Sequence, residues 1–219
     1  VIMSGMILAG ILALNMLPDN VSFGETVQIA GEMGKLNLIN FQFDPNDRYN
    51  IWSGLIAGTF LSLSYFGTDQ SQVARYLSGT SVTESRLSLI FNGLLKIPMQ
   101  FVILFIGVLV YVFYLFNQAP VFHNQVLKER ALQTENAAPI RQLETEYNEL
   151  FQKKREAVDG LVSAIESKDE AQVNNARDRV KAIQQEESVL RDSVRGSIAH
   201  AIPGAKTQDR VYIFLNLVL

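Results

Sequence analysis

The sequence predicts an all-α, multi-pass membrane protein with a helical hairpin inserted between membrane segments. Two observations carry this prediction. Charged residues make up 19% of the chain but are segregated, few of them between residues 51 and 116 and many between 128 and 210. Long apolar runs fill much of the charge-poor part, and such runs are what a bilayer requires of a helix. The two kinds of segment therefore belong in two different solvents.

Apolar runs divide the chain into membrane helices and connections. A bilayer core of about 30 Å needs about 20 mostly apolar residues, and the run ending at Phe116 meets that length best. The run from Ile51 is short and holds three glycines, so we expect a broken helix, although alone it also suits a soluble core helix. The predicted order is the end of a membrane helix (1–17), an external loop (18–50), a broken membrane helix (51–70), a cytoplasmic loop (71–86), a membrane helix (87–116), an external insertion (117–210) and the start of a further membrane helix (211–219).

Basic and aromatic residues predict the orientation. Trp52 and Tyr114 lie at ends of apolar runs, where amphipathic rings favour the headgroup layer. The short loop at 71–86 holds Arg75 and Arg86, and short basic loops stay in the cytoplasm. The insertion is then on the outer side. Because both chain ends lie in apolar runs, we also expect an internal portion of a longer polypeptide.

Residues 139–198 predict the hairpin itself. Apolar residues recur at three- and four-residue spacing on both sides of a polar turn, as amphipathic helices require. Ser167 and Glu170 have the spacing of a capping box, so we expect the second helix to begin near Lys168. Two helices of roughly 27 residues would reach about 40 Å from the membrane. The stripes are Ile140, Leu143, Tyr147, Leu150, Val158, Leu161 and Ile165, then Val173, Ala176, Val180, Ile183, Leu190 and Val194.

The hairpin has two interpretations. One is a self-packed antiparallel coiled coil, in which His123 and His200 are ordinary solvated residues. The other is a docking arm for a protein partner, and an apolar stripe left exposed after the helices pair would favour it. In that case the chain is a membrane-anchored interaction or scaffold protein that acts through its hairpin.

Composition argues against several other classes. A net charge of -3 gives no electrostatic basis for binding nucleic acid, and Lys153, Lys154 and Arg155 suit a solvated helical surface. The chain has no cysteine, which excludes thiolate metal sites and thiol nucleophiles. Paired carboxylates, a nucleophile with its base and a phosphate loop are not evident, so we do not expect an enzyme.

Lys96 is a charged residue inside an apolar run, and its presence there needs an explanation. A charge at the bilayer centre costs at least about 2.5 kcal/mol, so a membrane protein keeps one there for a partner or a task. Upstream lies the polar cluster Leu61-Ser-Leu-Ser-Tyr-Phe-Gly-Thr-Asp-Gln70, followed by Arg75-Tyr-Leu77 and then Leu94-Leu-Lys96. In this order and spacing, the chain from about Asp47 to Tyr114 resembles the sodium/solute symporter family, which includes the sodium/glucose cotransporters, and a bacterial member in particular.

The resemblance implies a fold, a function and a location. The fold would be a portion of a transporter built of two inverted five-helix repeats, with 51–70 as the first helix of the second repeat. The function would be symport of a small polar solute (a sugar, amino acid, sialic acid or carboxylate) by alternating access. Sodium would be the coupling ion, with its ligands expected outside this portion and no cofactor. The location would be the plasma membrane, here a bacterial inner membrane, with the hairpin outside.

The resemblance also implies roles for residues. Ser62 would hydrogen-bond the substrate, Tyr65 would close the pocket on its cytoplasmic side, and Lys96 would line it. A hydroxyl and an ammonium can orient an oxygen-rich or anionic solute, and a tyrosine ring offers a flat apolar face. Support of the helix end and gate would come from Asp69, Gln70 and Arg75.

Three departures from the family qualify these roles. Sugar transporters of the family tend to have an amide or threonine at the position of Ser62 and a tryptophan at that of Phe66. A hexose is therefore not implied. Pro98 follows Lys96 closely, and a proline frees a carbonyl about one turn earlier and reorients what lies around it. Lys96 could then face a neighbouring helix instead of the pocket.

Overall fold

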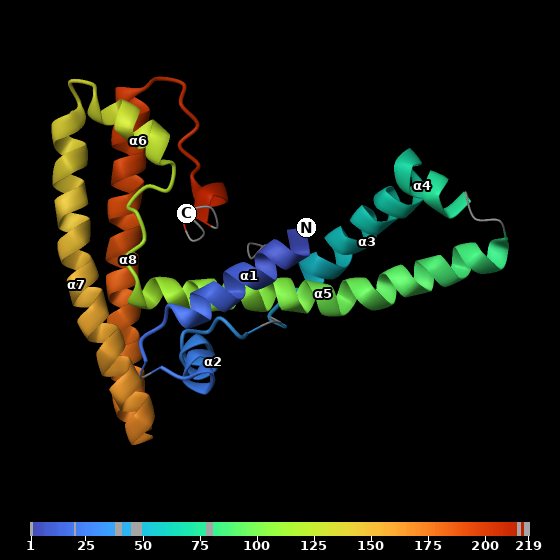
Figure 1. Ribbon diagram of the computed structural model, residues 1–219, viewed down its shortest axis with the longest axis horizontal. Helices are drawn as coiled ribbons and strands as arrows, with labels where there is room; N and C mark the ends of the chain where they lie inside the picture. Colours follow the sequence, from blue (N-terminus) through green and yellow to red (C-terminus); the bar gives the residue numbers. More distant parts are fainter. Residues whose placement is uncertain are drawn as a thin grey trace. The chain divides into compact units, whose positions relative to one another are not determined.

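The protein is helical throughout the part that the structure describes. The computed structural model describes residues 2–19, 21–37, 41–44, 50–77, 81–213 and 216, and no strand occurs among them. The all-α class predicted from the sequence agrees with this. The helices are α1 (Ile2–Asn15), α2 (Phe23–Glu32), α3 (Ile51–Gly67), α4 (Gln70–Leu77), α5 (Val82–Phe116), α6 (Gln125–Leu132), α7 (Ala137–Ser167) and α8 (Glu170–Ala201), followed by a 3₁₀ turn at Arg210–Tyr212 (Figure 1).

The chain forms two compact units. The first unit combines Val1–Gly34 with Ile106–Leu219, and the second unit is Lys35–Phe105. Helix α5 contributes its earlier part to the second unit and its last part to the first. Each unit is described below by itself.

Among the described residues, α5 is the one helix long and apolar enough to cross a membrane. Its 35 residues include the whole stretch predicted as a membrane helix, 87–116, and begin five residues earlier. Apolar helices also occur at Ser4–Asn15 and Ile51–Tyr65, but both are shorter. Of the further membrane helix expected at 211–219, residues 214–215 and 217–219 lie outside the described residues.

The second unit places a helix break at the end of α3. Helix α3 is regular from Ile51 to Gly67, so Gly54 and Gly58 lie inside a continuous helix. The interruption expected within 51–70 falls instead at Thr68 and Asp69, between α3 and α4. The expected loop at 71–86 is also largely helical. Polar caps explain this, because Asp69 accepts a hydrogen bond from the Ser71 amide at 2.9 Å at the start of α4.

The expected external loop at 18–50 contains helix α2. Its start is a capping box, in which the Ser22 hydroxyl accepts from the Glu25 amide at 3.3 Å. The Glu25 carboxylate in turn accepts from the Ser22 hydroxyl at 2.7 Å and from the Ser22 amide at 2.6 Å, and these two hydrogen bonds lower the pKa of Glu25. Such reciprocal bonds satisfy two amides at a helix start. The Ser-x-x-Glu spacing was readable in the sequence, so this helix was predictable.

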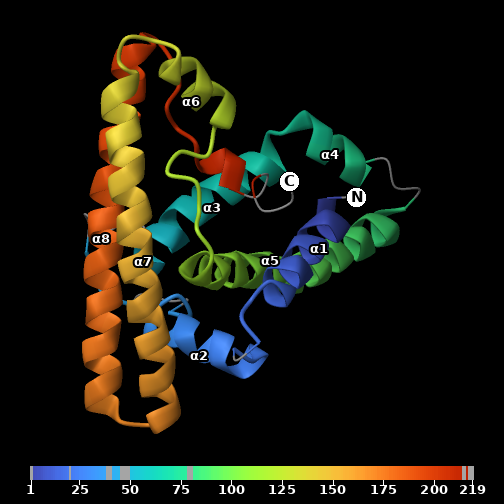
Figure 2. The ribbon, with the colours of Figure 1, turned by 60° about the vertical axis from the view of Figure 1, so that its left-hand side comes forward.

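Helices α7 and α8 lie side by side in both views of the ribbon (Figures 1 and 2). Their connection is short, because Lys168 takes a left-handed conformation (φ 57°) and Asp169 caps α8 through the Ala171 amide at 2.9 Å. The predicted capping box is wrong, since Ser167 ends α7 and donates its hydroxyl to Ala164. Fully buried side chains between the two helices and their neighbours include Ile140, Leu161, Val158, Val180, Val194 and Ile198.

The last part of α5 meets this helix pair near its middle. The Tyr111 hydroxyl and the Gln184 side chain are hydrogen-bonded at 3.0–3.2 Å, and the Arg155 guanidinium donates to the Phe116 carbonyl at 2.7 Å. Gln184 and Arg155 are both close to the midpoints of their helices. The pair therefore extends on both sides of the end of α5. A reach of about 40 Å from the membrane stays a prediction.

Helix α1 packs against the same part of α5. Ala9 and Ala13 are buried together with Ile106 and Val110. The helices approach closely at Gly10, where an added Cβ would lie 3.2 Å from the Ile106 side chain. Small residues permit such proximity, so α1 holds α5 in position from Ile106 onward.

Candidate functional site

Two of the predicted substrate-binding residues contact each other in the second unit. The Lys96 ammonium of α5 lies 5.2 Å from the centre of the Tyr65 ring of α3. A cation within about 6 Å of a ring face is attracted by the ring quadrupole, by about 0.5–1 kcal/mol at exposed sites. Lys96 thus faces a neighbouring helix, as its nearness to Pro98 suggested, and the neighbour it meets is itself a predicted site residue.

Ser62, the third of these residues, opens onto a groove along α3. The groove has a volume of about 650 Å³ and is lined by small and apolar residues that include Gly54, Gly58 and Gly67. An added Cβ at any of these three glycines would meet nothing within 4 Å. Small residues one turn apart allow another helix or a solute to approach the backbone. The Ser62 hydroxyl is the polar group one turn before Tyr65 on this helix.

The residues predicted to support the helix end lie at the junction of α3 and α4. The Asp69 carboxylate accepts from the Ser71 amide and from its hydroxyl, at 2.9 and 2.7 Å. Gln70 is the first residue of α4. Arg75 belongs to α4, but its side chain lies outside the described part of the structure. Of the three, Asp69 therefore has an observed hydrogen-bonding role at a helix end.

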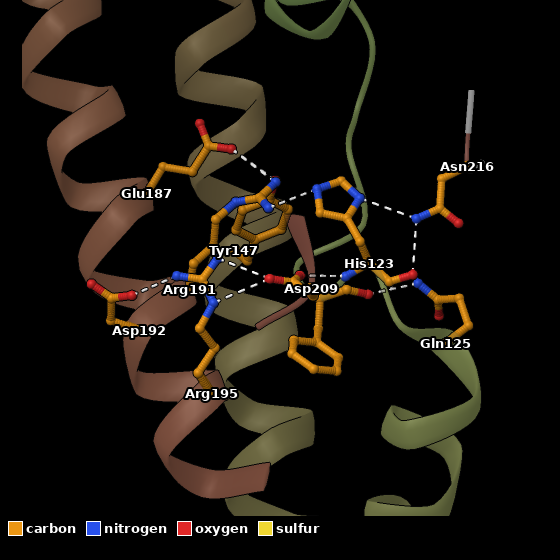
Figure 3. A network of polar contacts seen from close by, with 10 residues as sticks. His123, Gln125, Tyr147, Glu187, Arg191, Asp192, Arg195, Asp209 and Asn216 are labelled. Atoms are coloured by element: carbon orange, nitrogen blue, oxygen red, sulfur yellow. Dashed lines mark hydrogen bonds and ion pairs between the residues drawn. The ribbon is translucent and has the colours of Figure 1, made fainter. Parts of the chain in front are cut away.

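A second cluster of polar side chains, in the first unit, was not predicted (Figure 3). The Arg191 guanidinium donates to the His123 ring at 3.2 Å and to the Tyr147 hydroxyl at 2.6 Å. Tyr147 donates to one oxygen of Glu187 at 2.8 Å, and Lys154 donates to the other at 2.8 Å. Helices α7 and α8 and the loop after α5 thus contribute to one hydrogen-bonded network.

Burial and charge change the pKa values in this network. Burial and, to a smaller extent, the Arg191 charge lower the pKa of His123 to about 4. Burial also lowers the pKa of Lys154. For Glu187, burial raises the pKa, but the Lys154 ammonium and the hydrogen bonds outweigh this and hold the pKa below its usual value. At neutral pH the His123 ring of the network is therefore an uncharged imidazole.

Asp209 connects this network to the backbone of the loop after α5. It is fully buried and accepts from the His123 amide at 2.7 Å and from the Arg195 guanidinium at 3.0 and 3.2 Å. The Asp209 carboxylate thus satisfies the buried His123 amide and also pairs with the half-buried Arg195 charge. Asp209 therefore fixes the position of His123.

The network corrects two interpretations from the sequence. His123 is 6% exposed and Lys154 3% exposed, so neither is a solvated surface residue, whereas His200 is exposed. One signal was present in the sequence. Glu187, Arg191 and Arg195 recur at four-residue spacing and form a polar stripe on α8. What faces that stripe was not readable, because His123 and Lys154 are distant along the chain.

Comparison with known proteins gives matches over part of the chain. The human sodium-coupled monocarboxylate transporter 1 is 44% identical over 59 residues, which are 27% of this chain and 10% of that protein. The human sodium/iodide cotransporter is 32% identical over 68 residues, 31% of this chain and 11% of the relative. A putative sodium-dependent multivitamin transporter of Drosophila melanogaster is 32% identical over 62 residues, 28% and 10% of the two chains.

These matches cover only a small part of each relative. The chain spans about a tenth of the length of the curated relatives it matches. No family model and no solved structure matches it. The relatives are sodium-coupled solute transporters by name, and this supports sodium-coupled symport at the level of the family. Among the described residues, no group of three or more histidine, aspartate or glutamate side chains could hold a metal ion.

Proposed function

We propose that the protein takes part in sodium-coupled symport of a small polar solute by alternating access. The observation that carries this proposal is the identity of 44% over 59 residues with a sodium-coupled monocarboxylate transporter. The exposed apolar surface of the second unit supports it, because such side chains suit a lipid or helical environment. The fold would be a portion of an inverted-repeat transporter. We propose a carboxylate as the first candidate solute, because one relative is by name a monocarboxylate transporter.

The site residues keep the roles that the resemblance implies. Ser62 would hydrogen-bond the solute from the groove along α3, and Lys96 would attract an anionic group. The Tyr65 ring, 5.2 Å from the Lys96 ammonium, would hold that charge until a solute competes for it. Asp69, Gln70 and Arg75 would stabilise the junction where the helix must bend between inward- and outward-facing states. Transport requires only different affinities in the two states.

The proposed location is a plasma membrane. Helices α3 and α5 would cross the bilayer, with α4 at the cytoplasmic side and α7–α8 outside. Because the end of α5 meets the middle of the α7–α8 pair, the pair would lie along the outer membrane surface if α5 is close to the membrane normal. A bacterial inner membrane remains the proposed compartment.

Uptake into proteoliposomes tests this function. Pyruvate, glucose, an amino acid and sialic acid would each be offered with and without an inward sodium gradient. We expect accumulation of one class with sodium alone. Accumulation of none, or equal uptake with potassium in place of sodium, would contradict the proposal.

Substitutions test the site separately. Lys96→Ala and Tyr65→Ala are expected to abolish sodium-dependent uptake while the protein stays in the membrane. Lys206→Ala, which removes an exposed lysine outside the helices, is the matched control and should leave uptake unchanged. If uptake persists in both site variants, the transport function can stand but the site assignment fails.

A second candidate function rests on a groove between α7 and α8. It has a volume of about 660 Å³ and is lined by apolar residues that include Leu150, Leu190 and the 63% exposed Val189. Its charged lining residues are Glu146, Glu149, Glu186 and Lys153, three anions and one cation. Apolar residues among mainly acidic ones suit one partner, an amphipathic helix whose apolar stripe is flanked by lysine or arginine. The protein would then act as a membrane-anchored interaction protein.

Deleting residues 139–198 separates the two candidates. In the symporter account, a chain without them retains sodium-dependent uptake, although its stability falls. If the deletion eliminates the cellular function more completely than Lys96→Ala does, the helix pair is the functional part instead.

A further inference from the structure

The polar network of the first unit borders a cavity of about 420 Å³. This is within the range of about 300–1,000 Å³ that small-molecule sites occupy. Its walls come from the last part of α5 and from α7 and α8, all within one unit. The lining residues include Val110, Tyr111, Tyr114, Lys154, Glu187 and Arg191.

The charged side chains of this cavity do not balance. Lys154 and Arg191 are both cationic, and the Glu187 carboxylate is the single anion among the described lining residues. Glu187 accepts from Lys154 at 2.8 Å and is 3.5 Å from Arg191. His123 adds a neutral ring that accepts from Arg191. Because both cations are largely buried, their excess positive charge costs free energy that an anion would recover.

The remaining walls are apolar and aromatic. Tyr111 and Tyr114, about one turn apart on α5, line the cavity together with Val110. The hydroxyls of both tyrosines hydrogen-bond to other lining residues, Gln184 and the Ile213 carbonyl. Their rings add apolar contact surface. Charged groups and apolar surface thus line the same cavity.

We propose that this cavity binds an amphipathic anion, a single carboxylate or phosphate on a compact apolar body. The anionic group would take the side of Arg191 and Lys154, and the apolar body would lie against Tyr111, Tyr114 and Val110. The proposed transport site consists of Ser62, Tyr65 and Lys96, and none of these lines the cavity. An anion bound in the cavity therefore goes beyond the proposed transport function. Two sources have this chemistry, a soluble organic acid and the headgroup region of an acidic phospholipid.

Calorimetric titration of the full chain in phosphatidylcholine nanodiscs tests the proposal. The probes are benzoate and the uncharged benzamide, which have nearly the same shape. Benzoate is expected to bind at least about tenfold more tightly, since a charge-assisted contact is worth about 1.4 kcal/mol or more. Arg191→Gln should remove that preference, whereas Arg179→Gln on the exposed face of α8 should keep it. Equal binding of the two probes would overturn the proposal.

Two further variants separate loss of the site from loss of the fold. Glu187→Gln removes the competing carboxylate, so benzoate affinity should rise several-fold, a direction that structural damage does not produce. Gly107→Leu should abolish binding by filling the cavity, because an added Cβ there meets nothing within 4 Å. If Glu187→Gln lowers benzoate affinity and Gly107→Leu leaves it intact, the anion site is not this cavity.

The source of the anion and the independence of the site follow from two more titrations. In nanodiscs containing phosphatidylglycerol, a lipid-occupied cavity would bind benzoate more weakly, and Gly107→Leu would cancel the difference between the two lipids. An unchanged benzoate affinity would assign the site to a soluble acid. Lys96→Ala should leave benzoate binding intact, and its loss in that variant would attribute binding to the transport site and refute a separate one.

Discussion

The second unit and the α7–α8 pair are both helical and both contain large apolar side chains, which are mostly exposed in the second unit and mostly buried in the pair. In the second unit Leu94 is 69% exposed, and most large apolar side chains of α3 and of early α5 are exposed with it. In the pair Leu161 is fully buried, and the outward faces are charged. Burial of apolar area is what stabilises a helix pair in water. In the proposed account, the pair therefore faces water and the second unit faces lipid or further helices.

Helix α5 contains both a stretch with exposed apolar side chains and a stretch with buried ones. Up to Leu104 most of its large apolar side chains are exposed, whereas Ile106, Val110 and Phe113 are buried against α1. The change coincides with the boundary between the units. Apolar composition alone therefore does not tell whether a helix segment is covered by protein, because sequence periodicity is weak in both parts of α5.

The largest stability difference is expected between matched leucines. Leu161→Ala should cost about 2–5 kcal/mol, because it leaves a cavity in a packed core. Leu94→Ala should change the free energy of unfolding by about 0.5 kcal/mol or less. Hydrogen exchange of the α7 and α5 amides measures both. Equal protection losses would remove the distinction between the two regions.

A smaller effect is expected at Asp209. Asp209→Asn should destabilise the first unit by about 1–3 kcal/mol, since the buried Arg195 and His123 contacts lose their charged acceptor. Asp192→Asn is the control, because Asp192 pairs with the same Arg195 at 2.7 Å but is largely exposed. Thermal unfolding followed by circular dichroism compares them. An equal loss in both would show that the burial of Asp209 adds nothing.

The pH dependence of the first unit should follow His123. Its pKa of about 4 lies below the usual 6.5, so between these values the unfolded chain binds more protons than the folded one. Stability is then present in full above pH 6.5 and falls as the pH drops toward 4. His123→Gln should flatten the pH profile in this window. An unchanged profile would mean that other groups cause the loss.

The smallest effect is expected on the outer surface of the pair. Asp159→Asn removes the partner of Arg155, 3.3 Å away, but the carboxylate is 53% exposed. Exposed pairs at this spacing contribute about 0.5 kcal/mol or less. The same unfolding measurement should therefore detect almost no change. A loss of more than about 1 kcal/mol would indicate that this region is less solvated than the structure has it.

Much of the fold was predictable because periodicity is local. The stripes through Ile140 to Ile165 and Val173 to Val194 indicated the helices α7 and α8, and the long run ending at Phe116 indicated α5. Helix ends were less predictable. Ser167 and Asp169 are both good caps, and the structure uses Asp169, because a left-handed Lys168 ends α7 first.

The candidate site was only partly predictable. The resemblance brought together Tyr65 and Lys96, which are 31 positions apart and in contact. The network around Arg191 depends on residues far apart in the sequence, such as His123 and Asp209, which are 86 positions apart, and no periodicity encodes such pairs. A sequence also does not distinguish a buried charged residue from an exposed one. For this reason Lys154 was predicted to lie on a solvated surface.

Labelling of introduced cysteines tests most directly whether the two regions face different solvents. The chain contains no cysteine, so Val189→Cys and Leu94→Cys can be compared in an otherwise thiol-free background. The two side chains are similarly exposed, 63% and 69%, and differ only in their proposed surroundings. A membrane-impermeant maleimide should label intact cells carrying Val189→Cys and spare Leu94→Cys, since lipid excludes the reagent and keeps the thiol protonated. Equally fast labelling of Leu94→Cys would contradict the membrane assignment.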